Sequence, residues 1–215
     1  METRIVIADD HPVVLIGARA IIESARVGVI VGEAGSTDAL IDLLDNVECD
    51  VLVTDFSMPG TRYADGLRML DVIHHRHPQL PIVLLTMLDN AGVLKTAMSK
   101  GVSGLIDKSS TMAGLANAVN VVKQGGVYVA ERWREPLEAD RRGRVSGSRQ
   151  VRLSPREYEV VRLLASGFSV SEIAARLDRT ISTISRQKGT AMRKLGIDSD
   201  AGLFEYAQHH GLLSR

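Results

Sequence analysis

The chain has 215 residues, 45% hydrophobic and 24% charged, and its 26 basic and 26 acidic residues give a formal net charge of zero. This length suits two domains that each bury a core of their own. No apolar run reaches the roughly 18 residues that a membrane helix needs, and no charged-then-apolar leader follows Met1. We therefore expect a cytoplasmic protein without a membrane partner. Cys49 is the only cysteine, which excludes an internal disulfide and a thiolate metal cluster.

The neutral total hides an asymmetry between the two ends of the chain. Residues 1–130 contain 10 lysines and arginines against 15 aspartates and glutamates, a net charge of −5. Residues 131–215 contain 16 against 11, a net charge of +5. A basic module is typical of nucleic-acid binding, although an ordinary solvated surface can reach the same charge.

Five short apolar runs alternate with segments of helical periodicity in the first part of the chain. The runs are residues 4–8, 29–32, 51–54, 82–85 and 104–106. Repeated strand-helix alternation predicts an α/β fold with a doubly wound, five-stranded parallel sheet in the order 2-1-3-4-5. We assign it to residues 1–125.

Polar and small residues follow this domain and indicate a linker over residues 126–150, in which Trp133 is expected to pack against a helix. Residues 151–215 are predicted to form a second, all-α domain of four helices. Capping boxes at Ser154 and Ser169 begin the first two helices. Ser182 is expected to cap the third helix, and the fourth begins near Ser199.

Acidic residues gather where predicted strands end. Asp9 and Asp10 follow the first strand and Asp55 follows the third, while Thr86 and Lys108 end the fourth and fifth. Asp9 and Asp10 alone could serve helix capping, but the carboxyl ends of neighbouring parallel strands meet at one edge. Oxygen-only ligands there suit Mg²⁺. A carboxylate, a metal and a lysine together indicate phosphoryl transfer to Asp55.

These five positions, with the run from Thr54 to Gly60, resemble the receiver domain of bacterial two-component response regulators, a flavodoxin-like fold. The resemblance implies that Asp55 accepts a phosphoryl group from a histidine kinase or a histidine phosphotransfer protein. It also implies that a receiver assists its own phosphorylation and dephosphorylation. Mg²⁺ would be held by Asp9, Asp10, Asp55 and the backbone carbonyl of Ser57, and the phosphoryl group would contact Thr86 and Lys108. Residues 61–65 lengthen the next loop, which resembles the RcsB branch of the family.

The third helix of the basic module has the composition of a helix that reads the DNA major groove, although a solvated amphipathic helix is the alternative. Its candidate DNA contacts are Thr183, Ser185, Arg186, Gln187, Lys188 and Lys194. The module resembles the LuxR-type helix-turn-helix of the NarL/FixJ family. That resemblance implies a final dimerisation helix over residues 201–210 and a homodimer on an inverted-repeat operator in double-stranded DNA.

We predict a transcriptional response regulator of a two-component phosphorelay, switched by phosphorylation of Asp55 rather than acting as an enzyme. One alternative is a regulator that works without phosphate, as a heterodimer with an auxiliary regulator. Another is a phosphatase with an aspartyl intermediate, but Ser57 stands where a general acid would be needed.

Overall fold

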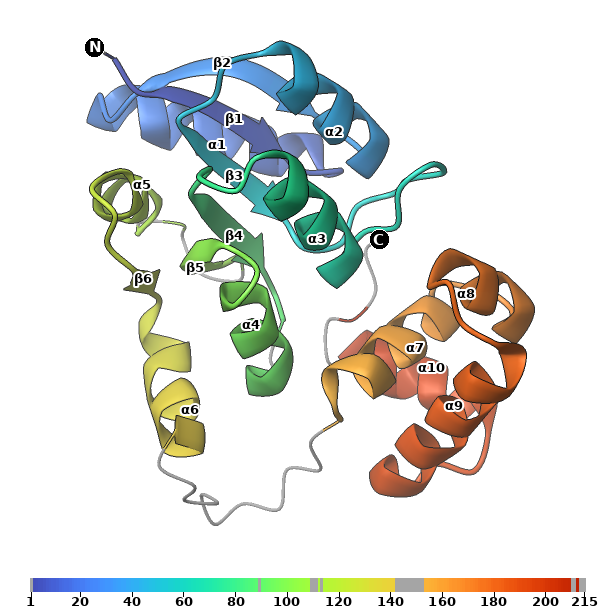
Figure 1. Cartoon of the computed structure of the whole chain (residues 1–215). Coiled ribbons are helices and arrows are strands. Elements are labelled where there is room, and N and C mark those ends of the chain that lie inside the picture. Colours follow the sequence, from blue (N-terminus) through green and yellow to red (C-terminus); the bar gives the residue numbers. More distant parts are fainter. Residues whose placement is uncertain are drawn as a thin grey trace. The chain divides into compact units, whose positions relative to one another are not determined.

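The computed structural model describes residues 2–88, 90–108, 112, 114–141, 153–209 and 212 (Figure 1). The chain divides into two compact units. One unit contains residues 1–87 and 97–134, and the other contains residues 88–96 and 135–215. Residues 142–150 of the predicted linker and the terminal residues 213–215 lie outside the described ranges.

The first unit contains a parallel sheet of six strands in the order β2-β1-β3-β4-β5-β6. The strands are β1 (Arg4–Ala8), β2 (Val29–Ala34), β3 (Val51–Asp55), β4 (Ile82–Thr86), β5 (Val102–Asp107) and β6 (Tyr128–Val129). The predicted order is confirmed for the first five, but the predicted number is wrong by one. β6 has only two residues, too few for a recognisable pattern, and its strand geometry comes from pairing with Gly104 and Leu105 of β5.

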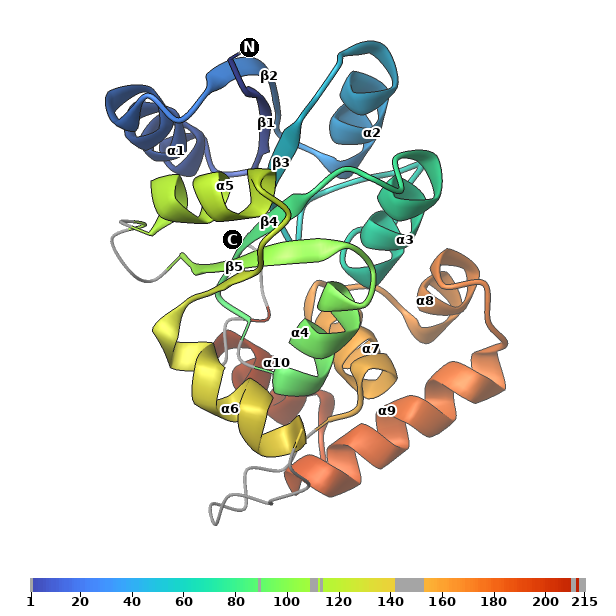
Figure 2. The same ribbon diagram turned by 60° about the vertical axis from the view of Figure 1, so that its left-hand side comes forward.

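Helices cover both faces of this sheet. α1 and α5 lie on one face, and α2 and α3 lie on the other (Figure 2). Ile5, Ile7, Val51 and Val53 pack against the inner side chains of α1 and α5 in one buried cluster, which explains the near-continuous apolar strands. The helix bounds are α1 (Pro12–Ala25), α2 (Thr37–Asn46), α3 (Leu67–Arg76), α4 (Ala91–Met98) and α5 (Leu115–Lys123).

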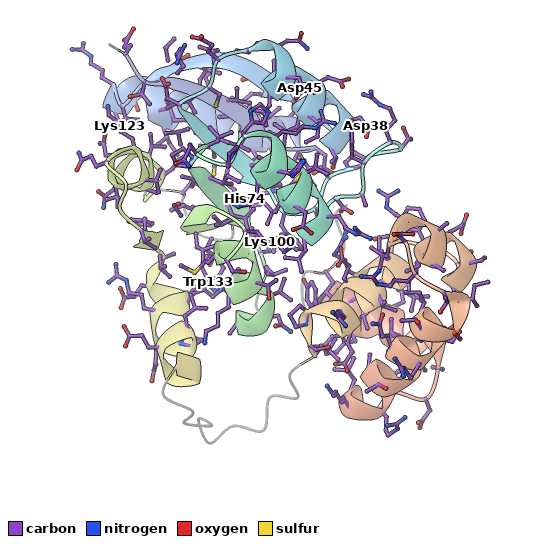
Figure 3. All side chains as sticks on the ribbon, viewed as in Figure 1. Asp38, Asp45, His74, Lys100, Lys123 and Trp133 are labelled. Carbon is purple, nitrogen blue, oxygen red and sulfur yellow. The ribbon has the colours of Figure 1, made fainter. Side chains whose placement is uncertain are left out.

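The segment predicted as a linker begins with regular structure. β6 is followed by α6 (Glu131–Arg141), near the start of which lies Trp133 (Figure 3). The side chain of Trp133 is only 1% exposed, in agreement with its predicted packing role. Arg132 donates to Asp107 at 2.6 Å and so ties the start of α6 to the end of β5.

The second unit contains the four predicted helices. They are α7 (Pro155–Ala165), α8 (Val170–Arg176), α9 (Ile181–Leu195) and α10 (Asp200–His209). Both capping boxes are present, since Ser154 pairs with Glu157 and Ser169 with Glu172. The predicted cap of α9 is wrong by two residues. Thr180 accepts the N–H of Thr183, so the helix begins at Ile181, two residues earlier than a cap at Ser182 would place it.

Candidate functional site

The carboxyl ends of β1 and β3 bring two aspartates side by side. Ala8 pairs with Thr54 in the sheet, so the next residues, Asp9 and Asp55, extend from the same edge. Both are buried, at 1% and 6% exposure. The predicted convergence of these carboxylates is therefore present in the fold.

Lys108 lies between the two carboxylates. Its Nζ is 2.6 Å from Oδ2 of Asp9 and 2.7 Å from Oδ2 of Asp55, and its side chain is 10% exposed. The backbone N–H of Lys108 donates to the carbonyl of Thr86 at 3.1 Å, which holds the lysine at the end of β5. The single ammonium thus offsets part of the charge of two buried carboxylates.

Burial dominates the electrostatics of this site. Removal from water raises the pKa of Asp55 to about 6. Lys108 opposes this rise only in part, and the negative charge of Asp9 adds to it. Burial also works against the charge of Lys108, but Asp55 and Asp9 outweigh it and raise the pKa of the amine. Asp55 is therefore a carboxylate of unusually high basicity held beside a charged ammonium.

The donor set around Asp55 fits a divalent cation. Ligand atoms of Asp9, Asp10, His11 and Asp55 all lie within 4.8 Å of one another. Carboxylate oxygens are the ligands that Mg²⁺ prefers, and their mutual repulsion falls when a cation lies among them. His11 is not among the metal ligands predicted from the sequence, although its position directly after the acid pair indicates that it lies close to them. Its Nδ1 lies 2.9 Å from Oδ1 of Asp10 and 3.2 Å from Oδ1 of Asp9.

Two further predicted residues lie at the same edge of the sheet. Thr86 ends β4, the neighbour of β3, and is 3% exposed. Ser57 follows Asp55 by two residues, and its hydroxyl donates to the buried carboxylate of Asp65 at 3.0 Å. Asp65, which the sequence did not single out, thus holds the loop that carries Ser57.

The lengthened loop after Gly60 is anchored to α2 through one carboxylate. Asp38 accepts the backbone N–H groups of Thr61, Arg62 and Tyr63 at 2.8–3.2 Å. Burial opposes its ionisation, but these hydrogen bonds prevail and lower the pKa of Asp38. Figure 3 shows Asp38 on α2 beside this loop.

The α9 helix has one exposed face, which we call the α9 stripe. Ile184 and Ala191 are fully buried on the other side. Exposed residues recur every three or four positions, as expected when one side of a helix faces solvent. The α9 stripe consists of Ile181, Ser182, Ser185, Arg186, Gly189 and Arg193. Lys194 is also exposed, but it lies about 100° further round the helix than Arg193 and is not part of the stripe.

Only part of the predicted DNA-contacting set lies on the α9 stripe. Ser185 and Arg186 do, whereas Thr183 and Gln187 are partly buried. Nζ of Lys188 lies 2.6 Å from Oδ1 of Asp200, at the start of α10.

Nζ of Lys194 lies 2.7 Å from Oε2 of Glu157, whose side chain is 11% exposed. Both lysines are therefore paired within their own unit. The sequence did not assign Ile181, Ser182 or Gly189 to the DNA-binding face, because such a stripe is recognised by exposure and not by charge.

Comparison with known proteins matches both units to families. Residues 5–120 match the response regulator receiver domain, and residues 151–207 match the bacterial regulatory proteins of the luxR family. No helix among the described residues is both long and apolar enough to cross a membrane.

Several relatives match over nearly their whole length. Transcriptional regulatory protein RcsB of Escherichia coli K12 is 40% identical over 202 residues, which cover 94% of this chain and 92% of that protein. Transcriptional regulatory protein MctR of Rhizobium johnstonii is 28% identical over 214 residues, covering 100% of this chain and 97% of MctR.

Two solved RcsB structures show the same architecture in the presence of DNA. RcsB from Salmonella enterica serovar Typhimurium, bound to promoter rprA with the phosphomimetic BeF3−, has a TM-score of 0.80 and 38% identity. That match covers 96% of this chain and 98% of the solved one. A structure of two RcsB dimers bound to two parallel DNAs has a TM-score of 0.77 and 37% identity, covering 96% and 98%.

Proposed function

This chain belongs to the response regulators that join a receiver domain to a LuxR-type regulatory domain, and from that premise we propose that phosphorylation of Asp55 switches its binding to DNA. The observation that carries the proposal is the ammonium of Lys108 within 2.7 Å of carboxylate oxygens of both Asp9 and Asp55. That position lets the lysine hold the oxygens of an incoming phosphoryl group.

The transfer step uses groups of this chain in defined roles. A carboxylate oxygen of Asp55 forms a bond to phosphorus, the P–N bond of a phosphohistidine breaks, and the histidine nitrogen leaves with the electron pair. With a pKa of about 6, Asp55 is mostly ionised at neutral pH and able to attack. Lys108 then moves its hydrogen bond to a phosphoryl oxygen, and the hydroxyl of Thr86 donates to another.

Asp9, Asp10, Asp55 and the backbone carbonyl of Ser57 would hold Mg²⁺. When bound, this ion neutralises the charge that develops on the transferred oxygens. Because these groups belong to the receiver itself, we expect it to accelerate both its own phosphorylation and the hydrolysis of its acyl phosphate. The phosphodonor would be a histidine kinase or a histidine phosphotransfer protein. A cytoplasmic location brings the chain together with that donor and with DNA.

The DNA-binding step belongs to α9. We assign base contacts to Ser185 and Arg186, which lie on the α9 stripe, and keep the partly buried Thr183 and Gln187 as further candidate contacts. Lys188 and Lys194 remain candidate DNA contacts, each of which must first leave an acidic partner. A homodimer on an inverted repeat fits a two-fold assembly, and RcsB dimers on DNA support it.

The test compares DNA affinity with and without a phosphate mimic. Duplexes are first selected from a randomised pool by the full chain in the presence of BeF3− and Mg²⁺. We expect BeF3− to raise the affinity of the wild-type chain for a selected duplex, and Asp55→Asn to abolish this response. Asp45→Asn, a change at the far end of α2, serves as the control and should respond like the wild type.

An Asp55→Asn protein that bound with the affinity of the activated wild type in every condition would contradict the switch. That result would favour the heterodimer with an auxiliary regulator, whose activity does not require phosphate.

A further inference from the structure

The α9 stripe begins with an apolar side chain. Ile181 is the first residue of α9 and is 57% exposed, whereas Ile184, three residues on, is fully buried in the core of the same unit. Ile181 therefore contributes little to the core. Its exposure keeps a branched hydrocarbon in contact with water in the free protein, at the face assigned to DNA.

The first turn of α9 contains no charged side chain and is already hydrogen-bonded. The hydroxyl of Thr180 lies 3.0 Å from that of Ser182 and 2.8 Å from that of Thr183, and it accepts the N–H of Thr183. No acidic residue lies in the first turn of α9. This turn can therefore approach DNA without repulsion, and its apolar group is the side chain of Ile181.

The position of Ile181 along the helix matches that of the proposed base contacts. Residues four apart lie on the same helical face, so Ile181 and Ser185 point the same way. A rise of about 1.5 Å per residue separates them by about 6 Å along the helix axis. At about 3.4 Å per base pair, that distance corresponds to about two base pairs.

We propose that Ile181 contacts the C5-methyl group of a thymine in the major groove and so selects an A·T pair about two base pairs from the contact of Ser185. Thymine alone among the four bases presents a methyl group there, and an apolar side chain is its physical complement. A cytosine amino group or a guanine oxygen at the same place would lose its water against hydrocarbon without gaining a hydrogen bond. The inference rests on the assignment of α9 to DNA in the proposed function.

The test removes single methyl groups from the DNA and then changes the side chain at position 181. A duplex selected from a randomised pool by the full chain with BeF3− and Mg²⁺ is remade with each thymine in turn replaced by deoxyuridine. We expect one thymine in each half-site at which this replacement weakens wild-type binding about fourfold, the effect of losing one buried methyl group. At every other thymine, the effect of deoxyuridine on affinity should be the same for the wild type and for the variants of Ile181.

A matched pair of variants separates apolar contact from shape. Ile181→Val keeps a branched hydrocarbon and should retain the preference for thymine over deoxyuridine at that position. Ile181→Thr has nearly the same shape as valine but carries a hydroxyl, and it should bind both duplexes equally. Circular dichroism checks that α9 persists in both variants.

The proposal fails if no thymine is sensitive in the wild type, or if Ile181→Thr keeps the sensitivity at the same thymine. Either result leaves DNA binding by α9 intact. A pool that yields no preferred sequence would instead contradict sequence reading by α9, and the assignment of Ile181 would be lost with it.

Discussion

The cluster of Asp9, Asp10, Asp55 and Lys108, which we call the acidic pocket, and the α9 stripe use charge in opposite ways. In the pocket, Asp9, Asp55 and Lys108 are buried together, and the one positive charge partly offsets the two negative charges. On α9, Lys188 and Lys194 pair with acids of neighbouring helices, and the exposed stripe contains hydroxyls, a glycine, two arginines and Ile181. Charged side chains thus mark the proposed phosphoacceptor site in the first unit but partly mark structural contacts in the second.

Removing the central cation of the pocket should give the largest effect. Lys108→Met leaves Asp9 and Asp55 facing each other without their ammonium partner. We expect the free energy of unfolding of the first unit to fall by about 3 kcal/mol. Denaturant unfolding followed by the fluorescence of Trp133, the only tryptophan, measures this change.

Two additional measurements sharpen this prediction. Millimolar Mg²⁺ should restore part of the stability of Lys108→Met, because a divalent cation replaces the missing positive charge. Lys123→Met, which removes an exposed lysine at the end of α5, should unfold like the wild type. Equal unfolding midpoints for the two variants would show that the pocket is not held together by Lys108.

Arginine on the α9 stripe should matter more for DNA than for folding. Arg186→Ala is expected to weaken binding to a selected duplex by about 10- to 100-fold, the range for loss of one good base contact, while stability stays unchanged. Fluorescence anisotropy with labelled duplex measures it. The control Arg156→Ala removes an exposed arginine from α7 and should change affinity far less. If both substitutions weaken binding equally, the effect is general charge and not reading by α9.

The paired lysines of α9 should show the reverse pattern. Lys194→Met removes the partner of Glu157, whose side chain is 11% exposed, and should destabilise the second unit by about 1 kcal/mol. Lys188→Met should cost less, because its partner Asp200 is 73% exposed. Circular dichroism during denaturation, compared with the Trp133 signal from the first unit, separates the two transitions.

The same pair predicts a pH dependence. Burial opposes ionisation of Glu157, but hydrogen bonds from Lys194 and Ser154 prevail and lower its pKa below the usual 4.5. A lowered carboxyl pKa adds stability above pH 4.5 that is lost as the pH falls through the folded-state pKa. The stability difference between wild type and Lys194→Met should therefore be full at pH 6 and shrink toward pH 3. A constant difference across this range would contradict the ion pair.

The smallest effect is expected at the loop beside the pocket. Asp38→Asn removes the charge that accepts three consecutive N–H groups, so amide hydrogen exchange should speed up at residues 61–63. The global stability should change by less than about 1 kcal/mol. Asp42→Asn, which affects only the side-chain ion pair of Arg62, is the control and should leave these amides protected. Unchanged exchange in Asp38→Asn would mean that other contacts hold the loop.

The pocket was predictable because strand order and strand ends follow from local patterns. Asp9, Asp55, Thr86 and Lys108 each come directly at the end of an apolar run, and a parallel sheet brings such ends to one edge. Asp65 was missed because its role depends on how the loop after Asp55 folds back, which no short pattern specifies. The strand β6 was not predicted for a related reason, since its two residues become a strand only by pairing with β5.

For this protein, the sequence alone determined the two modules, the sheet order of the first five strands, the capping boxes and the acidic cluster. All of these depend on residue types at short, regular spacings. Only the tertiary structure decided which side chains of α9 remain exposed. A lysine looks the same in sequence whether it faces solvent or an acid on another helix, and its partners Glu157 and Asp200 are 37 and 12 residues away. The packing of α7 against α9 and the position of the start of α10 beside Lys188 therefore assign Lys188 and Lys194 to ion pairs, while Ile181 stays at the surface.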